Sequence, residues 1–470
     1  KKARQRIKYE ELFMYVLKIN YLKKKINEDE SAIERNIDKS KIDSFIKNLS
    51  FELTLDQDKA VNDIINDLML KKRMNRLLQG DVGSGKTIVA FISMYANYLS
   101  GYQSALMAPT EILATQHYEE AKRLFSDYDI NVALLTSSTS SKDKKAIYKG
   151  LEDGSISIVI GTQSLIQENV KYKSLGLVIT DEQHRFGVNQ RDTFKSKGIS
   201  PDVLTMSATP IPRTYALTIY GDTDVSSIKS KPSGRKEVIT LFKKEKDILD
   251  VLEMMKKELD NGHQIYVVAP MIDTEDDNEK ESVYDLQDKM NKAFGKISKI
   301  GIIHGKLDSK DKDKVMKDFE NNNINILIST TVIEVGVNVP NASMIVIFNA
   351  NMFGLSTLHQ LRGRVGRSDI QSYCLLIAKN PEERLKLMEK TNDGFEISEY
   401  DFQTRGEGDL FGTRQSGDLG FKMANIKKDF KMLLKAKSDA DEFINMLLTF
   451  TSNPEFEPML EELKKVDNLE

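Results

Sequence analysis

The chain has 470 residues, 40% of them hydrophobic and 30% charged, which is about three domains of average size and the composition of a globular rather than a disordered or fibrous protein. Its single cysteine, Cys374, excludes an internal disulfide and a cysteine-rich zinc site, and its five histidines are too scattered for a sequence-local metal box, so we expect no structural metal. Its 68 basic and 71 acidic residues give a net charge of −3, so no global positive field attracts a polyanion, and any contact with nucleic acid must be local.

The N-terminal segment, residues 1–48, predicts helices that form a connector. Apolar residues recur there at helical spacing among charged ones, and the segment contains neither Gly nor Pro. Its basic start leads into Tyr9, Glu10 and Glu11 rather than into an apolar signal core, and no stretch of the chain approaches the roughly 18 to 20 apolar residues that span a bilayer. We therefore expect a cytoplasmic protein without membrane contact. The first residue is Lys rather than Met, which suggests a fragment or a processed product.

From residue 76 onward, short β-rich apolar runs alternate with longer helical segments, a pattern typical of a parallel sheet with helices on its faces. The first set of predicted strands is 76–79, 105–108, 132–135, 156–160, 177–180 and 203–207. The segment KSKPSGR, residues 229–235, lacks apolar periodicity and predicts a linker. The second set of predicted strands is 238–242, 265–269, 300–303, 326–330, 344–348 and 373–378. The sequence therefore predicts the α/β fold class, with domains at 49–230 and 231–395 and a C-terminal region at 396–470.

The string GDVGSGKT, residues 80–87, fits the phosphate-loop pattern G-x-x-x-x-G-K-[ST] and stands between a predicted strand and a helix-forming segment. Phosphate binding needs backbone amides that point into a concave loop at a helix N-terminus, and glycines let the chain bend that closely. Lys86 then supplies charge to the β- and γ-phosphates, and Thr87 supplies a hydroxyl to Mg²⁺. The predicted nucleotide-binding residues of this loop are Gly80, Gly83, Gly85, Lys86 and Thr87.

An acidic pair follows the apolar strand LGLVIT, residues 175–180. The pair, Asp181 and Glu182, stands at the carboxyl end of the strand, the edge where α/β sheets bind ligands. Asp181 suits a contact with Mg²⁺, and Glu182 suits the orientation and deprotonation of the attacking water. Alone, such a pair is more often a solvated turn. The phosphate loop in the same predicted sheet favours a hydrolytic pair.

The string QLRGRVGR, residues 360–367, supplies three arginines within six residues of the second predicted domain. A cation placed against the γ-phosphate stabilises the transition state of phosphoryl transfer. Arg364 and Arg367 would complete the site only when the two domains come together, so hydrolysis would drive domain motion. The alternative is a basic helix that covers the sheet, which the embedded Gly363 and Gly366 make less favourable.

Taken in order, the motifs resemble those of the superfamily-two helicases and translocases. They are FELTLDQ, GDVGSGKT, APTEILATQH, GTQSLIQ, DEQH, SATPIPRT, STTVIEVGVNVP and QLRGRVGR, and they cover residues 51–367. The wider strings LLQGDVGSGKT, DEQHRFGV, TTVIEVGVNVPNA, FGLSTLHQLRGRVGRS and RGEGDLFGTRQSG resemble the RecG family of bacterial ATP-dependent DNA helicases. The transcription-repair coupling factor shares the last region, but it has DEEHRFG, TATPIPRT and IETGIDIP where this chain has DEQHRFG, SATPIPRT and IEVGVNVP.

The resemblance implies two tandem RecA-like P-loop NTPase domains, a C-terminal helical hairpin, and ATP and Mg²⁺ as cofactors. Gln57 would read the adenine base. Gly336 and Asn338 lie in motif V, where the family usually has Asp at the second position. Asn can still accept a ribose hydrogen bond but carries no charge, so its contact with the nucleotide sugar is the departure from the family pattern.

The resemblance also implies which residues hold DNA and which couple ATP status to movement. Thr110, Gly161, Thr162 and Thr331 match neutral groups that hold nucleic-acid phosphates without reading bases. The coupling positions are Ser207, Thr209 and Gln360, together with Arg405, Arg414 and Gln415 as polar links of the motif RGEGDLFGTRQSG. For that last segment the alternative is a surface loop without a coupling role.

The activity implied by the resemblance is an ATP hydrolase that translocates on branched or duplex DNA and remodels stalled forks and Holliday-type junctions in recombination and repair. Single-strand-binding protein is an implied partner, and the implied location is the bacterial cytoplasm, near the nucleoid. The family's N-terminal wedge domain has no counterpart in residues 1–48, so we expect the motor half alone.

Two alternatives remain open. The chain could be the motor module of a transcription-repair coupling factor, which binding to RNA polymerase would favour. It could also be a nucleotide-gated DNA-binding protein without turnover, against which Lys86, Asp181, Glu182 and Arg367 argue, because a switch needs no water-activating carboxylate.

Overall fold

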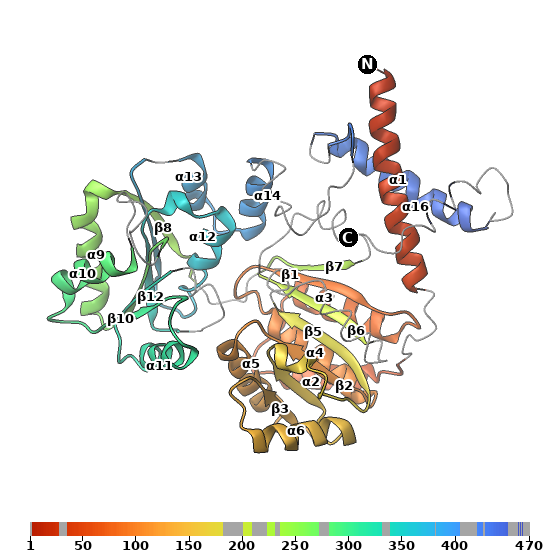
Figure 1. Ribbon diagram of the computed structural model, residues 1–470, viewed down its shortest axis with the longest axis horizontal. Helices are drawn as coiled ribbons and strands as arrows, with labels where there is room; N and C mark the ends of the chain where they lie inside the picture. Colours follow the sequence, from red (N-terminus) through yellow and green to blue (C-terminus); the bar gives the residue numbers. More distant parts are fainter. Residues whose placement is uncertain are drawn as a thin grey trace.

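The structure is a computed structural model that describes most of the chain. The described residues are 2–27, 35–181, 201–208, 223–230, 236–271, 282–330, 339–380, 382–404, 421–425, 428–449 and the three positions 459, 461 and 463. Two α/β units lie side by side in it, and two long helices cross each other beside the first unit (Figure 1). No helix in the described ranges is both long and apolar enough to cross a membrane.

The first unit is built on a seven-stranded sheet with the order β3-β4-β2-β5-β6-β1-β7. Its strands are β1 (Asn75–Gly80), β2 (Gln103–Met107), β3 (Val132–Leu135), β4 (Ile158–Gly161), β5 (Leu175–Asp181), β6 (Asp202–Ser207) and β7 (Asp224–Ile228). All the pairings between them are parallel. Its helices are α2 (Lys39–Lys47), α3 (Leu55–Met69), α4 (Lys86–Leu99), α5 (Glu111–Leu124), α6 (Ser141–Asp153) and the short η1 (Gln163–Ile166).

Helices cover both faces of this sheet, because successive side chains of a strand point to opposite faces. In β2, Leu106 packs with α2 to α5, whereas its neighbours Ala105 and Met107 pack on the other face with α6 and η1. All three side chains are buried. Strands that are buried on both faces have continuous apolar sequences. The short apolar runs between helical segments therefore predicted them.

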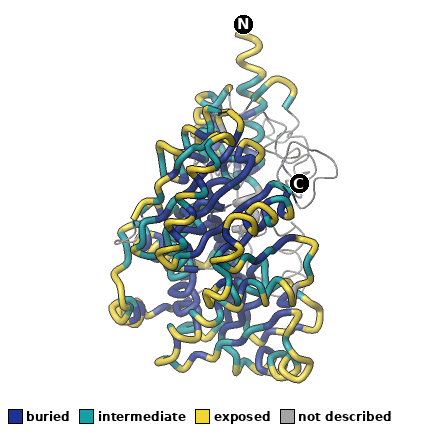
Figure 2. Tube along the Cα trace, turned by 90° about the vertical axis from the view of Figure 1, so that its left-hand side faces the viewer, coloured by how far each residue is buried: buried dark blue, intermediate teal, exposed yellow. Residues whose placement is uncertain are grey.

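The second unit is a six-stranded sheet with the order β10-β11-β9-β12-β13-β8, also parallel at every pairing. Its strands are β8 (Ile239–Lys244), β9 (Gln264–Val268), β10 (Ile300–Ile303), β11 (Ile326–Ser329), β12 (Ala342–Ile347) and β13 (Tyr373–Ala378). The helices are η3 (Glu245–Asp247), α9 (Ile248–Asp260), α10 (Val283–Phe294), α11 (Ser309–Glu320), η5 (Ala350–Met352), α12 (Leu355–Arg362), α13 (Glu383–Lys390) and α14 (Gly394–Thr404). Figure 2 shows buried residues gathered in the interior of the molecule and exposed residues at its surface.

The predicted α/β class with two parallel-sheet domains is confirmed. Every predicted strand overlaps a strand of the structure, and within the described ranges one strand, β7, was not predicted. It lies at the edge of the first sheet and pairs only with β1, so only part of it needs to be apolar. Two of its five residues are serines, Ser226 and Ser227, which removed the apolar signal.

The segment before the first sheet is anchored by one buried arginine. The guanidinium of Arg35 forms an ion pair with Asp202 at 2.5 Å and donates to the Asn97 side chain at 3.0 Å and the Gly176 carbonyl at 2.7 Å. Burial raises the pKa of the Asp202 carboxyl, and both Arg35 and the N–H of Met74 oppose that shift. Part of the predicted connector is therefore fixed to the first unit.

The first helix and a late helix pack against each other although they come from opposite ends of the chain. These are α1 (Lys2–Asn27) and α16 (Phe430–Thr449), which cross in Figure 1. Their contact buries Leu12 and Leu17 of α1 against Ala436 and Leu447 of α16. The helical character predicted for the N-terminal segment agrees with α1 and α2. The domain boundaries and the C-terminal hairpin remain predictions.

Candidate nucleotide site between the two sheets

The predicted phosphate loop has the strand-loop-helix geometry that its sequence indicates. It leaves β1 at Gly80 and enters α4 at Lys86. Gly83 and Gly85 have φ angles of 74° and 82°, in the left-handed region that only glycine adopts without strain. The Nζ of Lys86 donates to the carbonyls of Gly80 at 2.8 Å and Asp81 at 3.0 Å, so its charge is held against the backbone at the start of the loop.

Gln57, the predicted adenine reader, contacts the loop itself. Its Oε1 accepts the N–H of Thr54 at 2.8 Å in a capping box at the start of α3, and its Nε2 donates to the carbonyl of Ser84 at 2.8 Å. A Cβ added to Gly85 would lie 2.2 Å from this Nε2, so the glycine is required for the approach. Gln57 therefore fixes the position of the phosphate loop. Its contact with a base stays a prediction.

The residue before Gln57 connects this helix to the chain that leaves the first unit. The carboxylate of Asp56 accepts the N–H of Lys229 at 2.9 Å and the N–H of Ser230 at 2.8 Å. These bonds, with the one from Ser230 the strongest, hold the pKa of Asp56 below its ordinary value. The ammonium of Lys229 lies 5.5 Å from the centre of the Phe395 ring in α14, a cation–π contact with the second unit.

Asp181, the predicted Mg²⁺ ligand, is the last residue of β5, and His117 of α5 holds it. The Nε2 of His117 lies 3.0 Å from the Oδ2 of Asp181, and both side chains are buried. An ionised carboxylate only accepts hydrogen bonds, so the Nε2 of His117 is the donor in this contact. No role for His117 was predicted from the sequence. Its only signal was its place at the end of the motif APTEILATQH.

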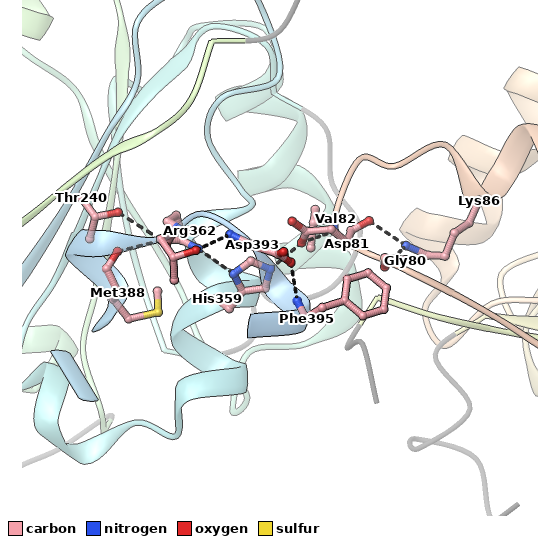
Figure 3. Close-up of polar contacts among 11 residues, drawn as sticks. Gly80, Asp81, Val82, Lys86, Thr240, His359, Arg362, Met388, Asp393 and Phe395 are labelled. Carbon is pink, nitrogen blue, oxygen red and sulfur yellow. Dashed lines mark hydrogen bonds and ion pairs between the residues drawn. The ribbon is translucent and has the colours of Figure 1, made fainter. Parts of the chain in front are cut away.

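The arginine-bearing turn of the second unit lies directly against the phosphate loop. Helix α12 ends at Arg362, and a Cβ added to the next residue, Gly363, would lie 2.7 Å from the Cβ of Val82 in the loop. His359 of α12 lies 2.5 Å from the Asp81 carboxylate, measured from Nε2 to Oδ1 (Figure 3). The two units therefore meet at the predicted nucleotide site, and neither His359 nor Asp81 was among the predicted site residues.

That turn carries Arg364 and Arg367, the two arginines predicted to act on the γ-phosphate and called here the finger arginines. Arg364 is buried, and the Nε of Arg367 donates to the carbonyl of Gly363 at 3.1 Å. Burial raises the pKa of Tyr266 in β9 to about 12, and the positive charges of Arg367 and Arg364 oppose this rise. Their position beside Gly363 agrees with the predicted interdomain placement. Their action on a γ-phosphate stays a prediction.

Three of the predicted DNA-contacting residues lie at one edge of the first sheet. Gly161 ends β4, Thr162 follows it, and Thr110 follows the neighbouring strand β2. Thr110 caps α5, accepting the N–H of Leu113 at 3.3 Å. A Cβ on Gly161 would lie 2.1 Å from the carbonyl oxygen of Leu135, so packing alone requires glycine there.

The remaining predicted site residues divide into two groups. Ser207 ends β6 in register with Gln79 of β1, beside the phosphate loop, and Gln360 is buried in α12. The other predicted residues lie outside the described part of the chain: Glu182, Thr209, Thr331, Gly336, Asn338, Arg405, Arg414 and Gln415.

Three protein-family models match the chain in the order of its parts. Residues 54–217 match the DEAD/DEAH box helicases, residues 243–369 match the helicase conserved C-terminal domain, and residues 391–469 match the C-terminal part of domain 3 of the ATP-dependent DNA helicase RecG.

Curated relatives agree with these matches. The chain is 50% identical over 448 residues to the ATP-dependent DNA helicase RecG of Staphylococcus aureus strain NCTC 8325, which covers 94% of this chain and 65% of that protein. It is 47% identical over 470 residues to the protein of the same name from Bacillus subtilis strain 168, covering 99% of this chain and 69% of that protein. The chain thus spans about two thirds of the length of these relatives.

Solved structures also match the chain. A structure of RecG bound to a three-way DNA junction is 42% identical, with a TM-score of 0.76, and the match covers 92% of this chain and 57% of that one. The DEAD-box helicase Mss116, at 17% identity and a TM-score of 0.58, covers 87% of this chain and 86% of its own and is similar in fold alone.

Proposed function

The chain belongs to the RecG family of ATP-dependent DNA helicases, and from that premise we propose that it is an ATP-hydrolysing motor that translocates on branched or duplex DNA. As part of a whole helicase, it would remodel stalled forks and Holliday-type junctions. The chain matches 65% of the length of the Staphylococcus aureus relative.

One observation carries the proposal: the turn that bears Arg364 and Arg367 lies against the phosphate loop of the other unit, with Gly363 on Val82. A site assembled from two domains can turn over only when those domains are correctly apposed. ATP turnover is then linked to domain closure, which is what a motor requires and a passive binding protein does not.

The residues of the first unit fit a nucleoside triphosphate with a divalent cation. Lys86 carries its charge over the loop, and the N-terminus of α4 supplies backbone N–H groups for phosphate oxygens. The hydroxyl of Thr87 and the carboxylate of Asp181 are hard oxygen donors, which suit Mg²⁺. When bound, Mg²⁺ would neutralise phosphate charge. His117 would hold Asp181 in place, and Glu182 would orient the attacking water.

On the DNA side, the proposal places Thr110 and Thr162 at one sheet edge as neutral contacts to a phosphate backbone. They follow the carboxyl ends of the paired strands β2 and β4, so one DNA strand could pass over both. Binding to single-strand-binding protein and location near the nucleoid are further expectations of the same proposal. The match of residues 391–469 to RecG domain 3 favours this motor over that of a transcription-repair coupling factor.

A steady-state ATPase assay tests the proposal, with no DNA, with a linear duplex and with a three-way junction of the same length. We expect Mg²⁺-dependent turnover that rises with DNA and rises most with the junction. Lys86→Ala is the control variant, because it removes the loop's cation and should abolish turnover while much of the ATP-independent DNA affinity remains. A wild-type protein that binds junctions but hydrolyses no ATP would instead support the nucleotide-gated binding protein.

A further inference from the structure

A continuous set of hydrogen bonds runs from the phosphate loop into the second unit. The Asp81 carboxylate, which also accepts the N–H of Val82 at 2.7 Å, accepts from the Nε2 of His359 at 2.5 Å. The Nδ1 of His359 in turn lies 2.9 Å from the Nη2 of Arg362. Figure 3 shows the imidazole ring of His359 between the carboxylate on one side and the guanidinium on the other.

Arg362 extends this connection to the end of α13. Its Nη1 donates to the carbonyls of Met388 at 2.9 Å and Thr391 at 2.8 Å, and its side chain is almost fully buried. Helix α14 starts three residues later, at Gly394, and ends at Thr404, directly before the segment RGEGDLFGTRQSG. The connection therefore leads from the phosphate loop to the helix that carries this segment.

The protonation of His359 follows from its two partners. A guanidinium has only donors, so the Nδ1 that faces Arg362 must be an acceptor. The proton is then on Nε2, which donates it to the Asp81 carboxylate. A neutral imidazole in this tautomer is required, because it accepts on one side and donates on the other. Asp81 also touches the loop's cation, since its backbone carbonyl accepts from Lys86 at 3.0 Å.

We propose that Asp81, His359 and Arg362 pass the position of the phosphate loop to the α13–α14 junction, with His359 as a positioning residue for the motor. This inference rests on the proposed ATP-driven function and deepens it. Movement of the loop around the phosphates displaces Asp81. The displacement reaches the carbonyls of Met388 and Thr391 through two buried side chains rather than through solvent.

Two amide substitutions that differ by one methylene group separate this role from simple packing. His359→Asn places an amide where Nδ1 stands, so it keeps the bond to Arg362, but it is too short to reach Asp81. His359→Gln offers an acceptor to Arg362 and a donor to Asp81. We expect His359→Asn to lower the maximal DNA-stimulated ATPase rate on the order of tenfold, the scale of one hydrogen bond to a charged group, with the ATP KM little changed. His359→Gln should restore most of the rate.

A fluorescent reporter follows the far end of the connection. The chain contains no tryptophan, so Phe395→Trp at the start of α14 adds a single fluorophore and keeps the cation–π contact with Lys229. A non-hydrolysable ATP analogue should change its emission. The change should be lost with His359→Asn and present with His359→Gln. The control is His263→Asn, because His263 also pairs with a carboxylate, Glu258, at 2.7 Å in the same unit but outside the connection.

The outcomes are distinct. If the parent protein hydrolyses no ATP, the proposed function itself fails. If the parent is active and His359→Asn keeps both its maximal rate and its fluorescence response, the connection is overturned while the motor stands. A raised ATP KM with an unchanged maximal rate would also overturn it, by placing His359 in nucleotide binding alone, as would a reporter that never responds to nucleotide.

Discussion

His117 holds Asp181 through a single hydrogen bond of 3.0 Å between Nε2 and Oδ2, with both side chains buried. The histidine comes from α5 and the aspartate from the end of β5, so the bond crosses from a helix to the sheet. Such partners orient a metal-binding carboxylate, and their loss commonly costs 10- to 100-fold in metal affinity or activity.

We therefore expect His117→Ala to raise the Mg²⁺ concentration for half-maximal ATPase activity by about 10-fold or more, with a smaller change in the maximal rate at saturating Mg²⁺. A Mg²⁺ titration of the DNA-stimulated rate measures both quantities. The matched control is His263→Ala, which removes a paired histidine in the second unit. Equal Mg²⁺ dependence in the two variants would show that His117 does not position Asp181.

The finger arginines give a second prediction. Arg364 and Arg367 stand beyond Gly363, at the contact with the phosphate loop, and a cation supplied to the transition state can contribute about 10³ to 10⁵ in rate. Ala at either position should lower the maximal DNA-stimulated rate strongly, with little change in ATP affinity measured in the absence of DNA. Arg384→Ala, in α13 of the same unit, is a control outside the site. A raised ATP KM at unchanged maximal rate would place the arginines in ground-state binding.

The parts of the site that the sequence predicted are those whose signal is local. The phosphate loop is specified by glycines at fixed spacing, two of which need positive φ, and Asp181 by its place at the end of an apolar strand. The strands were predictable because burial on both faces forces continuous apolar runs. Strand β7 was not, because a half-buried edge strand tolerates its serines.

What the sequence could not predict are pairings between distant segments. His359 and Asp81 are separated by 278 positions, and neither residue has a pattern of its own that indicates the other. Gln57 shows the same limit in another way: its bonds to the phosphate loop and to the capping residue of α3 were not predicted from its motif. Only the arrangement of the two sheets brings such partners together.

The buried ion pair of Arg35 and Asp202 leads to a prediction on stability. Breaking a buried pair by removing one partner typically costs about 3 to 5 kcal/mol, because the remaining charge is left uncompensated. We expect Arg35→Met to lower the free energy of unfolding of the first unit by about that amount, measured by urea denaturation followed by circular dichroism. Arg6→Met, which breaks the exposed pair of Arg6 with Glu10, should cause no measurable change. A loss below about 1 kcal/mol for Arg35→Met would contradict the anchoring role.

The last prediction concerns the acid sensitivity of the contact between Asp56 and the chain leaving the first unit. The N–H groups of Ser230 and Lys229 hold the pKa of the Asp56 carboxyl below its usual value of 3.8. A carboxyl whose pKa is lower in the folded state stabilises that state fully above its unfolded pKa, and loses the contribution as the pH falls through the folded value. Asp56→Asn should therefore be less stable than wild type at pH 7, by less than about 1 kcal/mol because the carboxylate is screened by solvent. The difference should shrink toward zero as the pH approaches 3 and falls below it.

The control for this prediction is Asp58→Asn, which removes a carboxylate from the same first turn of α3. The two variants therefore have the same net charge. Urea denaturation at pH 7, 5 and 3 gives the free energy of unfolding for wild type and both variants. If Asp56 acts through Ser230 and Lys229, its variant alone flattens the acid side of the stability profile, because Asp58 makes its contacts within α3, with Asn62. Identical profiles for the two variants would mean that a general charge effect at the helix N-terminus, rather than the anchored segment, sets the acid sensitivity.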